Sequence, residues 1–244
     1  MVHSFGKLVS KLLAIRLAPQ LPNLVANNQT AFVRGRALQD SYKFVQAASV
    51  LFRKKNIPTA MLKIDISKAF DTISWKFLLE VLQALGFGQR WRDWVAILLA
   101  SASSCLLLNS PPGPKIAHRR GVVKETPYLL CCSSLPWTRS TGWWLPRGGG
   151  EFFLCRVRHQ CSLYADDAIL FFSASTTETA RIKRLLEIFG NASGLVANLG
   201  KCSLSTIAAS DEVTGELAEV LGCRVAPFPV VYLGLITFEH QGLA

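Results

Sequence analysis

Acidic residues, long apolar runs and paired cysteines are all scarce in this chain. The 244 residues include 16 Asp and Glu against 27 Lys and Arg. The resulting formal charge of +11 favours a polyanionic partner such as nucleic acid, although a merely basic surface would explain it equally well. The longest apolar run, residues 95–100, is far shorter than the ~20 residues of a membrane span, and no signal peptide opens the chain. We therefore expect a soluble intracellular protein, nuclear or cytoplasmic, with no membrane partner.

The cysteine pattern excludes two further classes of protein. The seven Cys residues show neither the C-x₂-C pairs of a zinc site nor the density of a secreted disulfide framework, so we expect reduced and mostly buried thiols. Apolar residues make up 50% of the chain, which is too many for a disordered protein and enough for one large or two modest cores.

Hydrophobic periodicity predicts an α+β fold. Apolar residues at helical spacing predict helices over 5–17, 38–54, 75–85, 90–100 and 177–189. Short apolar runs predict strands over 61–66, 202–207 and 230–235, and hairpins over 105–118 and 161–172. Between residues 122 and 150 neither period holds, and this segment is expected to be poorly ordered.

Three carboxylates stand at the ends of predicted strands. Asp65 interrupts an apolar strand, and Asp166 and Asp167 occupy the tip of an apolar hairpin. A sheet that placed these strands side by side would gather three repelling charges, which a hard divalent cation such as Mg²⁺ would neutralise. Two such ions can activate a primer hydroxyl and stabilise a leaving pyrophosphate. For an isolated Asp-Asp pair, a solvated turn is the simpler interpretation.

The amino-acid sequence around these carboxylates favours a metal site over a solvated turn. The strand reads LKIDISKAFDTISW and the hairpin reads SLYADDAILFF, which resemble two palm motifs of reverse transcriptases. The surrounding strings HSFGKLVSKLLAIRLAP, NQTAFVRGR, FLLEVLQALGFGQRW, FGNASGLVANLGKCS and YLGL resemble plant LINE-type non-LTR retrotransposons. The likeness covers nearly the whole chain outside residues 122–150.

The resemblance implies an RNA-directed DNA polymerase, a nucleotidyltransferase with a right-hand palm and partial fingers. Its partners would be an RNA template, a DNA primer and deoxynucleoside triphosphates, and its cofactor Mg²⁺, with Mn²⁺ as an alternative. The implied catalytic and metal-binding triad is Asp65, Asp166 and Asp167, with the Ile66 carbonyl as a further metal ligand.

The resemblance also assigns nucleotide-binding roles. Phe70 would be the steric gate that leaves no room for a 2′-hydroxyl, with core packing as the alternative role. Arg34 and Arg36 would bind template or triphosphate phosphates, with a solvated loop as the alternative. Lys201, after a Gly-containing turn, would lie near the triphosphate.

One family motif is missing and can be recovered from a shifted reading frame. After HRRG the family has a segment like LRQGDPLSP, whereas this chain reads GVVKETPYLLCCSSLPWTRSTGWW. Joining the third base of each codon to the first two of the next, from Val122 onward, allows the reading RQGDPLSPMLFVLAMDPLHR. We therefore predict a frameshift near residues 120–123 that ends before Cys161, and little or no polymerase activity.

The expected organisation follows from these motifs. Residues 1–58 would form partial fingers, 59–121 the first part of the palm, 122–150 the frameshifted segment and 151–244 the second part of the palm, with the thumb absent or truncated. The endonuclease-like domain also looks missing. Two alternatives to an enzyme by descent stay open: a non-catalytic nucleic-acid-binding remnant, and a pseudogene product without a stable fold.

Overall fold

The computed structural model describes residues 4–107, 113–122, 161–165 and 167–237. The predicted frameshifted segment lies outside the described residues apart from Val122. The elements follow one another as α1 (Ser4–Leu17), α2 (Leu21–Leu24), α3 (Leu38–Lys54), β1 (Thr59–Ile64), α4 (Ala69–Thr72), α5 (Trp75–Ala84), α6 (Gln89–Ala100), β2 (Ser103–Ser104), β3 (Ile116–Ala117), β4 (Cys161–Tyr164), β5 (Asp167–Ser173), α8 (Thr176–Ser193), β6 (Ser203–Ile207), α9 (Asp211–Leu221), β7 (Arg224–Val225), β8 (Val230–Tyr232) and β9 (Leu235–Thr237).

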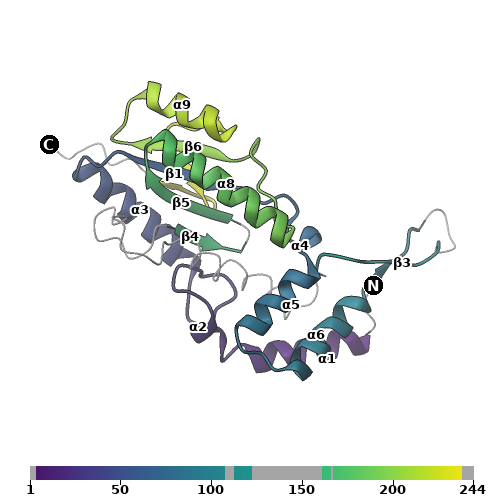
Figure 1. Cartoon of the computed structure of the whole chain (residues 1–244). Coiled ribbons are helices and arrows are strands. Elements are labelled where there is room, and N and C mark those ends of the chain that lie inside the picture. Colours follow the sequence, from purple (N-terminus) through teal and green to yellow (C-terminus); the bar gives the residue numbers. More distant parts are fainter. Residues whose placement is uncertain (1–3, 108–112, 123–160, 166, 238–244) are drawn as a thin grey trace.

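A five-stranded sheet of order β4-β5-β1-β6-β7 forms the centre of the molecule. Strand β1 lies in the middle and pairs antiparallel with both β5 and β6, while the short β7 pairs parallel with β6. The predicted α+β fold, a palm-like sheet with packed helices, is confirmed, but the sheet is mixed and not purely antiparallel, because β7 runs parallel to β6. Figure 1 shows α8 and α9 on one face of this sheet and α3 on the other.

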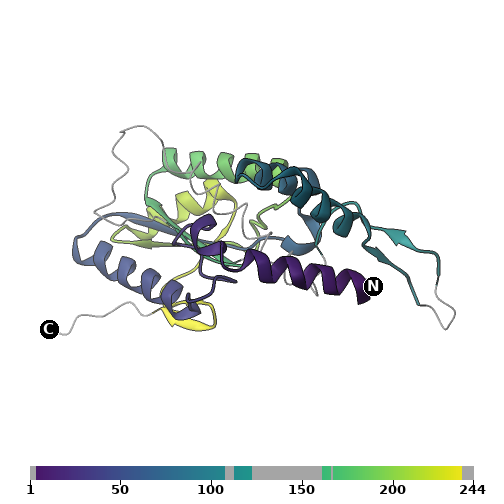
Figure 2. The same cartoon turned by 90° about the horizontal axis from the view of Figure 1, so that it is seen from below.

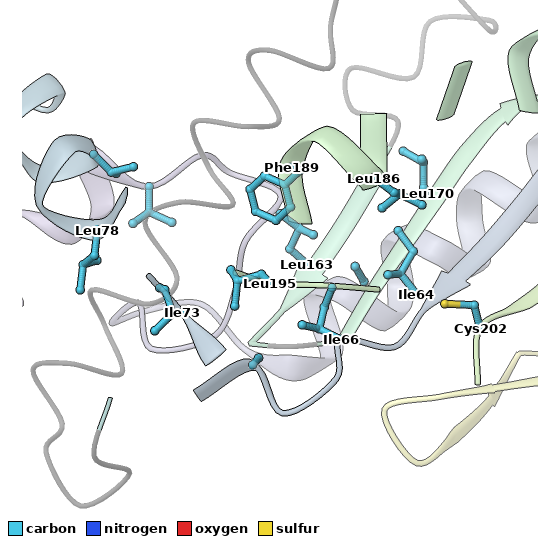
Figure 3. Packing of buried hydrophobic residues seen from close by; sticks show 14 of the residues in the cluster. Ile64, Ile66, Ile73, Leu78, Leu163, Leu170, Leu186, Phe189, Leu195 and Cys202 are labelled. Atoms are coloured by element: carbon cyan, nitrogen blue, oxygen red, sulfur yellow. The ribbon is translucent and has the colours of Figure 1, made fainter. Parts of the chain in front are cut away.

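Both faces of the sheet are buried, which explains why its central strands read as continuous apolar runs. Along β1, Leu62 and Ile64 belong to the larger hydrophobic cluster, and Met61 belongs to a second cluster on the opposite face. Figure 3 shows the larger cluster, where Leu186 of α8 meets Leu170 of β5. The second cluster lies under α3 and the C-terminal β8–β9 hairpin.

Helix α3 has the predicted bounds. Val45, Ala48 and Phe52 are buried, whereas Tyr42 and Leu51 are only half-buried. The helical period of 3.6 brings Val45, Ala48 and Phe52 onto one stripe.

Two helical regions go beyond the predictions. Helix α8 begins at Thr176, where the Ser175 side chain accepts a hydrogen bond from the Glu178 N–H, and continues to Ser193. It ends where Gly194 takes a left-handed conformation with φ 79°. Helix α9 was not predicted. No helix in the described part of the chain is both long and apolar enough to cross a membrane.

Candidate active site

The strand register places two of the three predicted carboxylates on neighbouring strands. Strand β1 pairs with β5 so that Ile64 lies opposite Ala168. Asp65 directly follows Ile64, and Asp167 directly precedes Ala168. Two acidic residues from distant parts of the sequence therefore lie at the same end of neighbouring strands.

The hairpin that carries Asp167 has a tight turn. Tyr164 of β4 pairs with Asp167 of β5, which leaves two residues in the loop. Ala165, the first of them, has a left-handed φ of 55°, a conformation that two-residue hairpins require and that a side chain makes costly. Asp166, the third member of the predicted triad, lies outside the described residues. Among the residues that are described, no group of three His, Cys, Asp or Glu side chains is arranged to hold a metal ion.

The backbone around Asp65 is fixed by a segment that follows α8. The Asp65 carbonyl accepts a hydrogen bond from the Asn198 N–H at 2.8 Å, and the Asp65 N–H donates to the Cys202 thiol at 3.4 Å. One residue further on, Ile66 forms an antiparallel bridge with Ala197. Because successive carbonyls of an extended chain point to opposite sides, the Ile66 carbonyl is directed away from Asn198 and towards the β5 side.

Lys201 lies in the turn that joins this segment to β6. Its N–H donates to the Asn198 carbonyl at 2.9 Å, and its side chain is exposed. Lys201 is therefore only three residues from Asn198, whose N–H holds the Asp65 carbonyl. Asn198 and Cys202 escaped the sequence analysis, because their contribution is a backbone N–H and a thiol, which no residue pattern marks.

Phe70 lies in α4, five residues after Asp65, and the residue that follows the β2–β3 arm holds its backbone. It is half-buried against the larger cluster, and its carbonyl accepts a hydrogen bond from the Val122 N–H at 2.6 Å. Two glycines press on the same turn: an added Cβ on Gly121 would lie 2.6 Å from the Asp71 carbonyl oxygen, and one on Gly194 would collide with the Thr72 carbonyl. The backbone of the Phe70 turn is therefore packed closely against two segments that are distant in the sequence, one at Gly121 and the other at Gly194.

The NQTAFVRGR segment pairs directly with the hairpin that carries Asp167. The Thr30 N–H donates to the Leu163 carbonyl at 3.1 Å, and the Leu163 N–H donates to the Asn28 carbonyl at 2.9 Å. The predicted fingers segment is therefore joined to β4 by backbone hydrogen bonds.

The two candidate arginines of this segment differ in their surroundings. Arg34 is exposed. The Arg36 guanidinium donates to the carbonyls of Ala26 and Gln29, both at 2.6 Å, and to that of Val25 at 3.2 Å. Burial lowers the pKa of Arg36 from its usual value. In this arrangement Arg36 organises its own loop, and a phosphate-binding role is easier to reconcile with Arg34.

A buried hydroxyl pair links the β4 strand to the YLGL segment. Tyr232 is fully buried, and its hydroxyl lies 3.2 Å from the Ser162 hydroxyl. Burial raises the pKa of Tyr232 to about 12, and the nearby Asp167 carboxylate acts in the same direction. The Ser162 hydrogen bond partly offsets both effects.

The thiols of the described residues are reduced. Cys105, Cys161, Cys202 and Cys223 form no disulfide, and burial raises the pKa of Cys161 to about 12 and that of Cys223 to about 11. The Cys161 and Cys223 thiols are therefore poor nucleophiles, and they fit a packing role better than a catalytic one.

A central mixed sheet with packed helices, and with acidic residues at one end of two neighbouring strands, is the architecture of a polymerase palm. The sequence comparison gives the particular family: the chain belongs to the reverse transcriptase (RNA-dependent DNA polymerase) family, whose profile matches residues 1–237. A relative described as "Transposon TX1 uncharacterized 149 kDa protein", from Xenopus laevis, is 26% identical over 211 residues. That alignment covers 81% of this chain and 15% of the relative.

Solved structures with a similar fold include yeast telomerases. Apo telomerase from Candida tropicalis, truncated from its C-terminal domain, aligns with TM-score 0.54 and 11% identity over 86% of this chain and 42% of that one. Candida albicans telomerase in complex with the TWJ fragment of telomeric RNA aligns with TM-score 0.55 and 11% identity over 82% of this chain and 33% of that one. At this identity the likeness concerns the fold alone.

Proposed function

We propose that this chain is the palm and partial fingers of a plant LINE-type non-LTR retrotransposon reverse transcriptase, and that its acidic site binds two divalent metal ions. The observation that supports the proposal is the register of β1 and β5, which ends with Ile64 opposite Ala168 and so brings Asp65 and Asp167 to the same end of the sheet. Like charges on neighbouring strands are destabilising, so this arrangement favours a cation between them. Asp166, next to Asp167 in the sequence, would supply the third carboxylate.

The donors available suit Mg²⁺, or Mn²⁺ in its place. Both ions prefer oxygen ligands, and the site offers carboxylates together with the Ile66 carbonyl, which is directed towards them. When bound, such ions would activate a primer 3′-hydroxyl and neutralise the departing pyrophosphate. The partners would be an RNA template, a DNA primer and deoxynucleoside triphosphates.

The residues around the carboxylates would handle the nucleotide. Phe70, fixed by the Val122 hydrogen bond, would lie under the incoming sugar and exclude a 2′-hydroxyl. Lys201, on the loop that holds the Asp65 backbone, and the exposed Arg34 would bind phosphates. Arg36 would contribute by shaping the loop that carries Arg34.

We also infer that this chain does not polymerise DNA. Val122 reaches the Phe70 turn, and the residues that follow it do not encode the RQGDPLSP motif with which the family supports the template and the incoming base. Catalysis of this type depends on positioning, and a displacement of order 1 Å can cost about a hundredfold in rate.

Metal binding tests the site without requiring activity. Titration of the full chain with Mn²⁺, followed by electron paramagnetic resonance, should show binding that Asp65→Asn and Asp167→Asn each weaken. Asp71→Asn is the matched control, because Asp71 is exposed and lies only six residues from Asp65. Equal Mn²⁺ binding by the wild-type chain and both site variants would exclude the proposed metal site.

Primer extension tests the loss of activity. The chain is incubated with an RNA template, a DNA primer, deoxynucleotides and Mg²⁺, beside a second protein in which residues 123–142 are replaced by RQGDPLSPMLFVLAMDPLHR. We expect extension only by the second protein, and none by its Asp65→Asn variant. Extension by the unaltered chain that disappears in Asp166→Ala would contradict the inactivity proposed here.

A further inference from the structure

The β2–β3 hairpin is an arm that projects from the body of the molecule. Its strands pair Ser103 with Ala117 and Ser104 with Ile116, and two more hydrogen bonds extend the pairing in both directions. These run from the Gly113 N–H to the Leu106 carbonyl at 2.9 Å and from the His118 N–H to the Ala102 carbonyl at 3.1 Å. Figures 1 and 2, at right angles to each other, both show the arm extending beyond the helices and the main sheet.

The charge of the arm has one sign. Between Asp93 and Glu125 the sequence contains no acidic residue, while the returning strand and its continuation carry Lys115, Arg119 and Arg120. All three side chains are exposed. Lys115 directly precedes β3, and Arg119 and Arg120 follow it, so positive charge flanks both ends of the returning strand. Such an arm attracts phosphate along its length.

The arm also exposes large apolar side chains. Leu106 is 63% exposed, Leu107 is 74% exposed and Ile116 is 52% exposed. Apolar side chains on a basic β-ribbon are a combination with which proteins contact sugars and bases in the groove of a duplex while cations hold the flanking phosphates. A purely electrostatic surface would not need them.

The base of the arm is fixed beside the candidate nucleotide site. The Gly121 N–H donates to the Ile73 carbonyl at 2.9 Å, and the Trp75 indole N–H donates to the Gly121 carbonyl at 2.7 Å. Together with the hydrogen bond from Val122 to Phe70, these contacts tie the arm to the turn that carries the proposed steric gate. Arg120 is next in sequence to this anchor, so a duplex on the arm would run towards the site.

We propose that the β2–β3 arm binds the RNA–DNA hybrid, with Lys115, Arg119 and Arg120 on its phosphates and Leu106, Leu107 and Ile116 against its groove. The proposal builds on the reverse transcriptase assignment for the identity of the duplex, but the binding needs neither metal nor catalysis. Hybrid binding through the arm is therefore a function that a catalytically silent chain would keep.

Fluorescence anisotropy with a labelled RNA–DNA hybrid, in EDTA and over a series of salt concentrations, tests the proposal on the full chain. The variant is Lys115→Ser, Arg119→Ser and Arg120→Ser together. The control replaces Lys43, Lys54 and Arg184, which are exposed on α3 and α8, so both proteins lose three positive charges from a formal +11. Each phosphate contact adds close to 0.9 to the slope of log affinity against log salt concentration in B-form duplex. The arm variant should reduce that slope by about 2 to 3, and the control should leave it close to the wild-type value.

A second variant tests the apolar contact. Ile116→Ser should weaken hybrid binding severalfold at every salt concentration without changing the slope. Equal slopes for the arm variant and the control would overturn the proposal, and so would binding lost equally in both proteins, which marks a general effect of net charge. Because EDTA removes divalent ions, a failure of metal binding at Asp65 leaves this result unaffected, and the two proposals fail separately.

Discussion

Gly121→Ala should destabilise the fold far more than the same change at Gly222 or Gly215. Gly121 has φ 81°, a left-handed conformation that costs an alanine about 1 kcal/mol. The added Cβ would also lie 2.6 Å from the Asp71 carbonyl oxygen and 2.8 Å from its carbonyl carbon. Because backbone cannot swing aside as a flexible side chain can, an overpacking cost of about 1–3 kcal/mol is expected in addition.

Two other glycines separate these costs. Gly222 has φ 77° with nothing within 4 Å of its added Cβ, so Gly222→Ala should lose about 1 kcal/mol from conformation alone. Gly215 lies inside α9 with open space around it, so Gly215→Ala should gain about 0.5–1 kcal/mol from helix propensity. One substitution type thus has three expected outcomes: a gain, a small loss and a loss of about 3 kcal/mol.

Urea unfolding followed by circular dichroism measures the three free energies, and thermal unfolding should show Gly121→Ala about 6–12 °C below the wild-type chain. The matched loss in Gly222→Ala isolates the conformational cost. Equal free energies of unfolding for Gly121→Ala and Gly222→Ala would show that Gly121 is not packed closely against the Asp71 backbone. The proposed anchoring of the Phe70 turn by Gly121 would then be refuted.

Three further predictions concern hydrogen bonds. Arg36→Lys should cost about 1–3 kcal/mol of unfolding free energy, because a lysine cannot reach the carbonyls that the guanidinium fork holds, whereas Arg34→Lys should stay within about 0.5 kcal/mol. Ser175→Ala, which removes the α8 cap, should cost about 1 kcal/mol in the same urea assay. Burial raises the Tyr232 pKa from 10.0 to about 12. The contribution of its neutral hydroxyl to the free energy of unfolding is therefore complete below pH 10 and is lost as the pH rises towards 12. Tyr232→Phe should therefore flatten the fall of stability between pH 10 and 12 in a pH series of melting temperatures.

The sequence predicted those elements whose signal is local. Helix α3 was found from its period of 3.6, and the 161–172 hairpin from apolar runs on either side of a tight turn. Helix α9 was missed although its signals were present: Ser210 caps it, Asp211 and Glu212 lie in its first turn, and Gly222 ends it. Val213, Leu217 and Leu221 also recur at helical spacing, so the local sequence was sufficient to predict this helix.

The acidic residues of the site could be predicted from the sequence, whereas the backbone hydrogen bonds around them could not. Asp65 and Asp167 are marked by a carboxylate inside an apolar run, which needs a compensating partner wherever it occurs. Among the supports of the site, Asn198 donates to the Asp65 carbonyl, Leu163 pairs with the Asn28–Thr30 segment and Val122 donates to the Phe70 carbonyl, and each acts through its backbone. A backbone contact between residues far apart in the sequence depends on sheet register, which propensity and periodicity do not encode.

The position of the proposed frameshift bears on whether binding and catalysis could be separated in this chain. The shifted reading begins at Val122, whose N–H donates to the Phe70 carbonyl. The contacts of Gly121 with Ile73 and Trp75, which anchor the arm, precede that residue. A frameshift at this point would replace the segment that supports the incoming base in the family. The altered chain would then keep the residues proposed to bind a hybrid and to hold metal ions, and would lose the part proposed to align a nucleotide.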